Sequence, residues 1–112
     1  TLPNTIVRLG DGCFQSCTKL ATITLPNTIT SLGDYCFQSC TSLISISCLA
    51  ASAPSTISPV FGTWNSYTGS ASTATKYLYV KSDATGYEGT TGDGWAVLLD
   101  PTKCNFKISK TL

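Results

Sequence analysis

The chain has 112 residues, the length of one small domain, and its seven basic and six acidic side chains give a net charge of +1. This balance offers no basic surface for nucleic acid and no charge excess for an anionic membrane. Histidine is absent, which removes the commonest general base, so we expect no enzyme activity and no cofactor. No apolar run reaches the ~20 residues of a membrane helix, so we expect no membrane insertion by this segment.

The chain begins with a 23-residue sequence that occurs twice. Residues 1–23, TLPNTIVRLGDGCFQSCTKLATI, align without gaps to residues 24–46, and 17 of the 23 positions are identical. A unit this short cannot bury its own apolar face, so the copies must stack as coils of a solenoid with a shared core. The inward positions are expected to be the apolar residues common to both copies, namely Leu2, Ile6, Leu9, Cys13, Phe14, Cys17, Leu20, Ile23 and their equivalents.

Each copy predicts two short strands and a tight turn. LATITLP and LISISCL alternate apolar and hydroxyl residues, which is the period-2 pattern of a half-buried strand, so Ile23 and Leu25 are expected to point inward. Pro26 ends the first of these strands because it has no N–H to donate. NTITSLG offers a second extended run that ends at Gly33, and DYCFQSC predicts one helical or 3₁₀ turn.

The repeat pattern L-P-x-x-I-x-x-L-G-x-x-C-F-x-x-C-x-x-L-x-x-I resembles the BspA-type leucine-rich repeat of surface proteins from Bacteroides-like anaerobes. The later stretches ISCLAASAP, YLYVKSDATGYEG and GW are similar to the closing segment of those proteins. The resemblance implies C-terminal repeats plus a cap. The implied fold is a β-rich solenoid of right-handed 23-residue coils with short strands and 3₁₀ turns, closed by an irregular α+β cap.

The chain is expected to divide into three parts. Residues 1–48 form two coils, residues 49–75 form a long Ser/Thr/Gly/Pro-rich excursion without a period, and residues 76–112 form the capping segment of the same domain. Because Thr1 starts within a coil, we also expect further repeats of the parent chain N-terminal to it.

Three elements are expected in the capping segment. TKYLYVK predicts a strand beside the second coil, with Leu78 and Val80 inward. SDATGYEG predicts a short helix capped by Ser82 or Asp83. GWAVLLDP is expected to bury Trp95, and CNFKISK predicts a closing strand with its phenylalanine and isoleucine inward.

The four repeat cysteines leave three interpretations open. Stacking places Cys13 over Cys36 and Cys17 over Cys40, at about 5 Å. Side-by-side Cβ vectors would strain a disulfide, and parallel C-x3-C pairs converge poorly on a tetrahedral zinc. The favoured interpretation is a ladder of small buried thiols, without a metal.

The candidate binding residues are surface side chains. If the strands align, hydroxyl rows that end in aromatic rings face outward, and aromatic rings beside hydroxyls suit protein or sugar recognition. Cross-strand packing without binding is the alternative. The aromatic residues of the long excursion form a second candidate group. The ligand-binding candidates are Thr22, Thr24, Ser45, Ser47, Tyr77 and Tyr79 on the strands, and Trp64 and Tyr67 in the excursion.

The resemblance implies an extracellular, cell-surface binding or adhesion module whose partner is a host or neighbouring-cell protein or a glycan. A structural spacer within a larger surface protein is the alternative. A domain that assists polysaccharide processing would need paired carboxylates near Trp64 or Trp95, for which Glu88 and Asp93 are the candidates. These acidic residues occur in turn-like contexts, which favours solvated turn residues instead.

Overall fold

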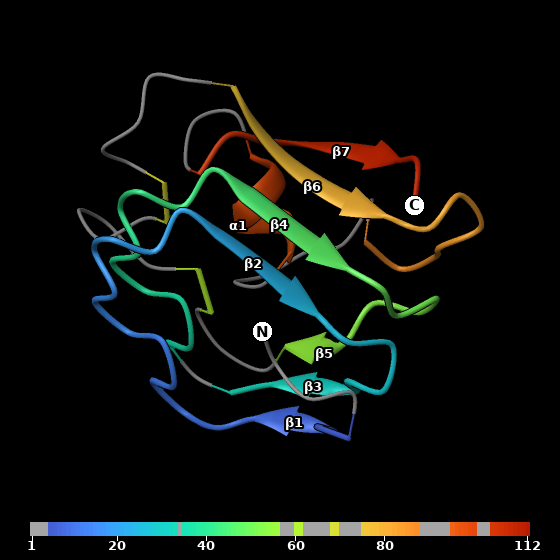
Figure 1. Ribbon diagram of the computed structural model, residues 1–112, viewed down its shortest axis with the longest axis horizontal. Helices are drawn as coiled ribbons and strands as arrows, with labels where there is room; N and C mark the ends of the chain where they lie inside the picture. Colours follow the sequence, from blue (N-terminus) through green and yellow to red (C-terminus); the bar gives the residue numbers. More distant parts are fainter. Residues whose placement is uncertain are drawn as a thin grey trace.

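Two parallel sheets line two sides of one core, and their strands recur once per coil (Figure 1). The larger sheet has the order β2-β4-β6-β7, and the smaller sheet has the order β1-β3-β5. The larger sheet contains β2 (Thr22–Leu25), β4 (Ser45–Cys48), β6 (Lys76–Val80) and β7 (Phe106–Lys110). The smaller sheet contains β1 (Arg8–Leu9), β3 (Ser31–Leu32) and β5 (Ser55–Thr56), and the helix α1 spans Trp95–Leu99.

The structure is a computed structural model that describes residues 5–33, 35–56, 60–61, 68–69, 75–87, 95–100 and 104–112. Within these ranges the chain is rich in strands, and all strand pairs are parallel, which agrees with a repeat solenoid. None of the helical residues in these ranges forms a segment long and apolar enough to cross a membrane.

Equivalent residues of neighbouring coils lie beside each other in both sheets. β2 pairs with β4 at a constant shift of 23 residues, so that Thr22 lies beside Ser45. β1 pairs with β3 at the same shift, with Leu9 beside Leu32. β6 then pairs with β4, which places Tyr77 beside Ser45. The stacking of the two repeats, and the position of TKYLYVK next to the second copy, are therefore observed as the sequence predicts.

The third side of the first two coils consists of consecutive tight turns. Backbone amides there donate to carbonyls three residues earlier, as in a 3₁₀ turn. However, Gly12 and Ser16 have φ values of 63° and 61°, and their equivalents Tyr35 and Ser39 have 56° and 60°. A residue in this left-handed region interrupts the helical path after each turn. The described residues of DYCFQSC therefore form the predicted tight turns with hydrogen bonds three residues back, but they do not form a helical segment.

Parts of the segment predicted as an excursion follow the path of a third coil. β5 lies in this segment and pairs with β3 in register, Ser55 beside Ser31. The ring of Phe61 stacks on Phe37 with the centroids 5.7 Å apart and the planes 7° apart. The amide of Phe37 donates to the carbonyl of Val60 at 2.8 Å, as Phe14 donates to the coil that follows it. The described residues of 49–75 thus continue the solenoid, although their sequence lacks the repeat pattern.

Burial differs between the first coil and the second. Phe37 and Cys36 are fully buried, whereas the equivalent Phe14 is half-buried and Cys13 is exposed. The cause is geometric, because among the described residues the first coil has a neighbouring coil on one side only. The prediction that all repeat cysteines are buried is therefore wrong for Cys13.

Of the three elements predicted for the capping segment, the two strands form, as β6 and β7, and the helix does not. β7 closes the larger sheet with Phe106 buried, and Trp95 is buried within α1, where its Nε1 donates to the carbonyl of Pro54 at 2.9 Å. The helix predicted for SDATGYEG is wrong over its described residues, which form a turn and an isolated bridge between Thr85 and Ser52. Tertiary contacts, not local propensity, determine that segment.

The close approach of neighbouring coils predicts opposite outcomes for two equivalent glycines. A Cβ on Gly33 would lie 2.6 Å from the backbone N of Asp11, whereas a Cβ on Gly10 meets nothing within 4 Å. We expect Gly33→Ala to destabilise the domain by ~1–3 kcal/mol through overpacking, and Gly10→Ala to leave stability nearly unchanged. Urea unfolding of both variants checks this. Equal unfolding midpoints would contradict the close contact.

Candidate functional site

The outward face of the larger sheet gathers the strand residues that the sequence singles out. The strand register gives two rows across four strands. Both rows run from hydroxyl side chains on β2 and β4 to tyrosines on β6, as predicted, and continue onto β7. The first row is Thr22, Ser45, Tyr77 and Lys107, and the second is Thr24, Ser47, Tyr79 and Ser109.

Alternation along each strand explains why these side chains face outward. On β6, Leu78 and Val80 are fully buried, whereas Tyr77 is 37% exposed and Tyr79 is half-buried. On β4, Ile46 is fully buried between the outward serines. The packed inner face therefore holds the backbone beneath the outward rows in one conformation.

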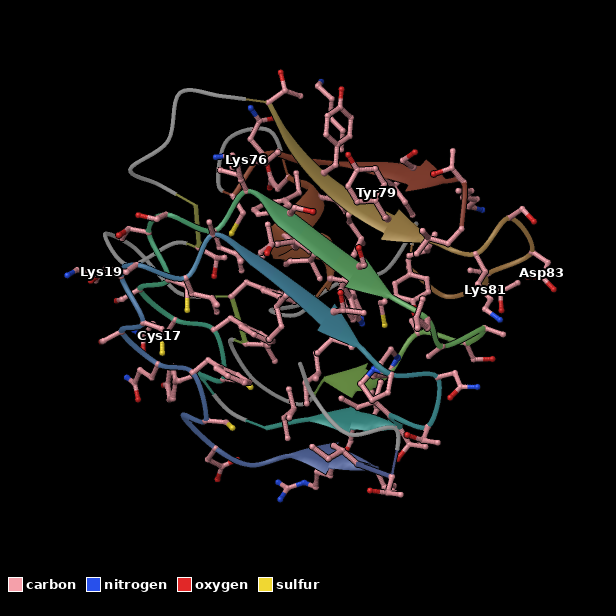
Figure 2. The ribbon with its side chains drawn as sticks, in the orientation of Figure 1. Cys17, Lys19, Lys76, Tyr79, Lys81 and Asp83 are labelled. Carbon is pink, nitrogen blue, oxygen red and sulfur yellow. The ribbon has the colours of Figure 1, made fainter. Side chains whose placement is uncertain are left out.

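The two tyrosines of β6 lie against each other. Their ring centroids are 5.6 Å apart and the ring planes differ by 28°. Figure 2 shows Tyr79 projecting from the front of the sheet over β6. Residues two apart on a strand share one face, so each ring restricts the rotamers of the other. The pair forms an ordered aromatic surface at low entropic cost.

The sequence analysis missed Lys107, which extends the first row beside Tyr77 and is exposed. The second lysine near these strands differs in its environment. Lys76 is 7% exposed, its Nζ donates to the carbonyl of Gly69 at 3.1 Å, and it lies 5.8 Å from the ring centroid of Phe106. Lys107 is therefore the cation that the outward rows present, while Lys76 belongs to the interior.

The remaining binding and carboxylate candidates all lie in segments that the structure does not describe. Trp64 and Tyr67, the aromatic candidates of the excursion, lie outside the described residues, and so do Glu88 and Asp93. No group of three or more His, Cys, Asp or Glu side chains that could hold a metal occurs in the part of the chain that the structure describes.

All six cysteines are free, and they differ in exposure. Cys13 is exposed and Cys17 is half-buried, whereas the other four, Cys36, Cys40, Cys48 and Cys104, are buried. The predicted ladder of buried thiols is therefore confirmed for Cys36 and Cys40 of the second coil, but not for Cys13 and only in part for Cys17.

The second cysteine position of the repeat is a hydrogen-bond donor. The thiol of Cys40 donates to the carbonyl of Phe14 at 2.9 Å. In the third coil, Thr68 takes this position, and its hydroxyl donates to the carbonyl of Phe37 at 2.6 Å. In the last coil, the thiol of Cys104 donates to Phe61 at 3.5 Å. Each side chain thus satisfies a phenylalanine carbonyl of the preceding coil, and we call this series the donor ladder.

Threonine in one rung of the donor ladder shows what the position requires. A hydroxyl cannot form a disulfide, yet Thr68 makes the same type of contact as Cys40. What the two side chains share is a proton to donate in a buried place. Local sequence could not reveal Thr68, because extra residues separate it from the period of the first two coils.

Burial keeps the inner thiols protonated. It raises the pKa of Cys36 to about 12, with the neighbouring Cys13 as the second cause, and the pKa of Cys40 to about 11. Burial also raises the pKa of Cys48, which accepts a hydrogen bond from the hydroxyl of Tyr87 at 3.0 Å. Because the thiolate is the nucleophile and the metal ligand, these three thiols are poorly reactive near neutral pH.

The donor ladder predicts which substitutions of Cys40 the protein tolerates. Cys40→Thr keeps a donor for the carbonyl of Phe14, and we expect little loss of stability. Cys40→Val has a similar shape but removes the thiol donor, so that the carbonyl of Phe14 keeps only the amide of Cys17 at 3.2 Å, and we expect a loss of ~0.5–1.5 kcal/mol. Urea unfolding under reducing conditions compares the two variants. A threonine variant no more stable than the valine variant would argue against the donor role.

The raised pKa values predict a loss of stability at alkaline pH. Cys40 titrates at about 11 when folded, against an ordinary value of 9.0. Below pH 9 both states keep the proton, so the contribution of the thiol is constant. Between pH 9 and 11 the unfolded chain loses its proton first, so the unfolding free energy falls by up to ~1.4 kcal/mol per pH unit for this thiol. Urea unfolding at pH 8, 9 and 10 measures the slope, which Cys40→Thr should reduce. An unchanged slope in that variant would show that Cys40 does not titrate this way.

Comparison with known proteins identifies one family. The family model described as "BspA type Leucine rich repeat region (6 copies)" matches residues 1–65, more than half of the 112 residues. Comparisons with curated proteins and with solved structures find no match. The matched range includes both copies of the repeat, the whole of β5 and the ring of Phe61, in agreement with the third coil. The chain therefore belongs to the BspA-type leucine-rich repeat family.

Proposed function

We propose that this chain is a non-catalytic recognition module of a cell-surface protein, and that it binds its ligand through the outward face of β2, β4, β6 and β7. The family supports the general part of this proposal, because its members are generally surface-associated, protein-binding repeat modules and are typically non-catalytic. The ligand that we propose is a protein or a glycan of a host or a neighbouring cell, and the proposed location is extracellular.

The observation that carries the proposal is the common register of the two outward rows. It brings two threonines, two serines and two tyrosines from three coils onto one face. Parallel sheets are usually covered on both faces. Here the described helix α1 packs against β7, and Figure 1 shows it behind the sheet, while the outward rows carry partly exposed polar and aromatic side chains. An open, rigid face with aromatic rings suits recognition.

Catalysis by this face would need groups that the face does not supply. Its outward positions carry hydroxyls, phenols and one ammonium group, and none of them is a carboxylate or an imidazole. A hydroxyl without a neighbouring general base is a weak nucleophile. The chemistry of this face therefore favours reversible binding through hydrogen bonds and ring contacts.

Removing the tyrosine pair tests the proposal. We expect the double variant Tyr77→Ala with Tyr79→Ala to lower binding to a panel of matrix proteins and glycans by about ten-fold or more, because aromatic anchors carry much of the binding energy. Loss of their mutual contact should cost ~0.5–1.5 kcal/mol, so the domain should remain folded. Surface plasmon resonance measures binding, and circular dichroism measures folding.

Tyr35→Ala is the matched control, because Tyr35 is 41% exposed and lies on the turn side of the coil, away from the sheet face. This variant should bind as the unmodified protein does. Unchanged binding after loss of Tyr77 and Tyr79 would reject the face as the site. Absence of any ligand on the panel would favour the alternative of a structural spacer, in which the tyrosines only pack against each other.

A further inference from the structure

We propose that the ligand of the outward face is an acidic glycan, whose carboxylate or sulfate group binds the ammonium group of Lys107 while a sugar ring contacts Tyr77. This inference rests on the proposed function and names the class of ligand for the same face. It is carried by the register of β7, which places Lys107 directly beside Tyr77.

The chemistry of the outward rows matches a ligand rich in hydroxyl groups. Five of the eight outward side chains are serines or threonines, and each offers one donor and two acceptor lone pairs. No outward position holds an aliphatic side chain, whereas the centre of a protein interface is usually apolar and depleted in serine. The tyrosine rings supply the apolar contact that one face of a sugar requires. These features favour a saccharide over a protein surface.

The charge of the face selects an anionic saccharide. Lys107 is exposed and, among the described residues, makes no ion pair. Lys81 follows directly after β6 and adds positive charge at the carboxyl end of that strand. Asp83 lies in the exposed turn beyond Lys81, away from the rows, as Figure 2 shows. An anionic sugar therefore meets a cation and no carboxylate at the outward positions.

A competing explanation of Lys107 comes from its place on an edge strand. β7 is the last strand of the larger sheet, and lysines on edge strands discourage pairing with other chains. That role requires only a charge near the edge, whereas glycan binding requires that the charge act together with Tyr77. Measurements of binding and of self-association on the same variants therefore separate the two roles.

Binding to four polymers tests the class of ligand. The probes are polygalacturonate (carboxylate), dextran sulfate (sulfate), unmodified dextran (neutral) and poly-L-glutamate (an acidic polypeptide), each compared at low and high salt. We expect binding to polygalacturonate or dextran sulfate that weakens with salt, and at least ten-fold weaker binding to dextran and to poly-L-glutamate. Equal binding of poly-L-glutamate would overturn the glycan class, equal binding of dextran would overturn the role of charge, and binding to none of the polymers would overturn the inference.

Variants of Lys107 test the site itself. We expect Lys107→Gln to weaken binding of the acidic polymer by about two- to five-fold, as is usual for one exposed ion pair, and Lys107→Arg to preserve it. Lys19→Gln is the control, because Lys19 is exposed on the turn side of the first coil and should have no effect (Figure 2). Unchanged binding of Lys107→Gln, with increased self-association, would assign Lys107 to edge protection and overturn the inference.

The double tyrosine variant distinguishes failure of this inference from failure of the proposed function. If the double tyrosine variant loses binding while Lys107→Gln does not, the face is the site and the acidic class is wrong. If the acidic polymer binds equally to the unmodified protein and to the double tyrosine variant, the face is not the site, and both proposals fail.

Discussion

Hydrogen bonding between equivalent residues of successive coils is the interaction on which the other features of this structure depend. Because β2 pairs with β4, and β1 with β3, at the 23-residue period of the repeat, each paired residue of the first coil lies beside its own equivalent in the second. Residues at equivalent positions therefore form rows, and each row lies on one side of the sheet. The inner rows form the core, the turn side places thiol or hydroxyl donors against carbonyls, and the outer rows form the open face. A single backbone register thus determines both stability and surface chemistry.

The aromatic residues of the core show how such a stack ends. The rings of Phe14 and Phe37 are nearly parallel, 3° apart, and Phe61 continues the series at 7°. Trp95 then lies tilted by 49° on Phe61, and Tyr87 packs edge-on against Trp95 at 74°. Parallel stacking can be extended by another coil, whereas an edge-on contact offers no equivalent flat surface. The change of ring geometry marks where the regular coils give way to the capping segment.

Much of the regular part could be predicted from the sequence, because repetition and alternation are visible in it. The outward position of Tyr77 followed from the strand pattern and from the apolar match between TKYLYVK and the earlier strands. Alternation in CNFKISK already points Lys107 outward, but its place beside Tyr77 could not be found, since the shift between β6 and β7 differs from the repeat period. The predicted helix near Tyr87 failed for another reason. The buried hydroxyl of Tyr87 donates to the carbonyl of Ala50 at 2.8 Å, and such tertiary contacts override a weak local helix preference.

Equivalent positions of neighbouring coils stay aligned even where the number of residues between them changes. From the second coil to the third, the difference in residue number between equivalent positions grows along the chain. It is 24 from Phe37 to Phe61, 28 from Cys40 to Thr68 and 32 from Ser45 to Tyr77, yet each pair remains aligned. The sheet face therefore stays in register although the number of residues between these aligned positions grows. In this architecture the length of the loops and the chemistry of the sheet surface can vary independently.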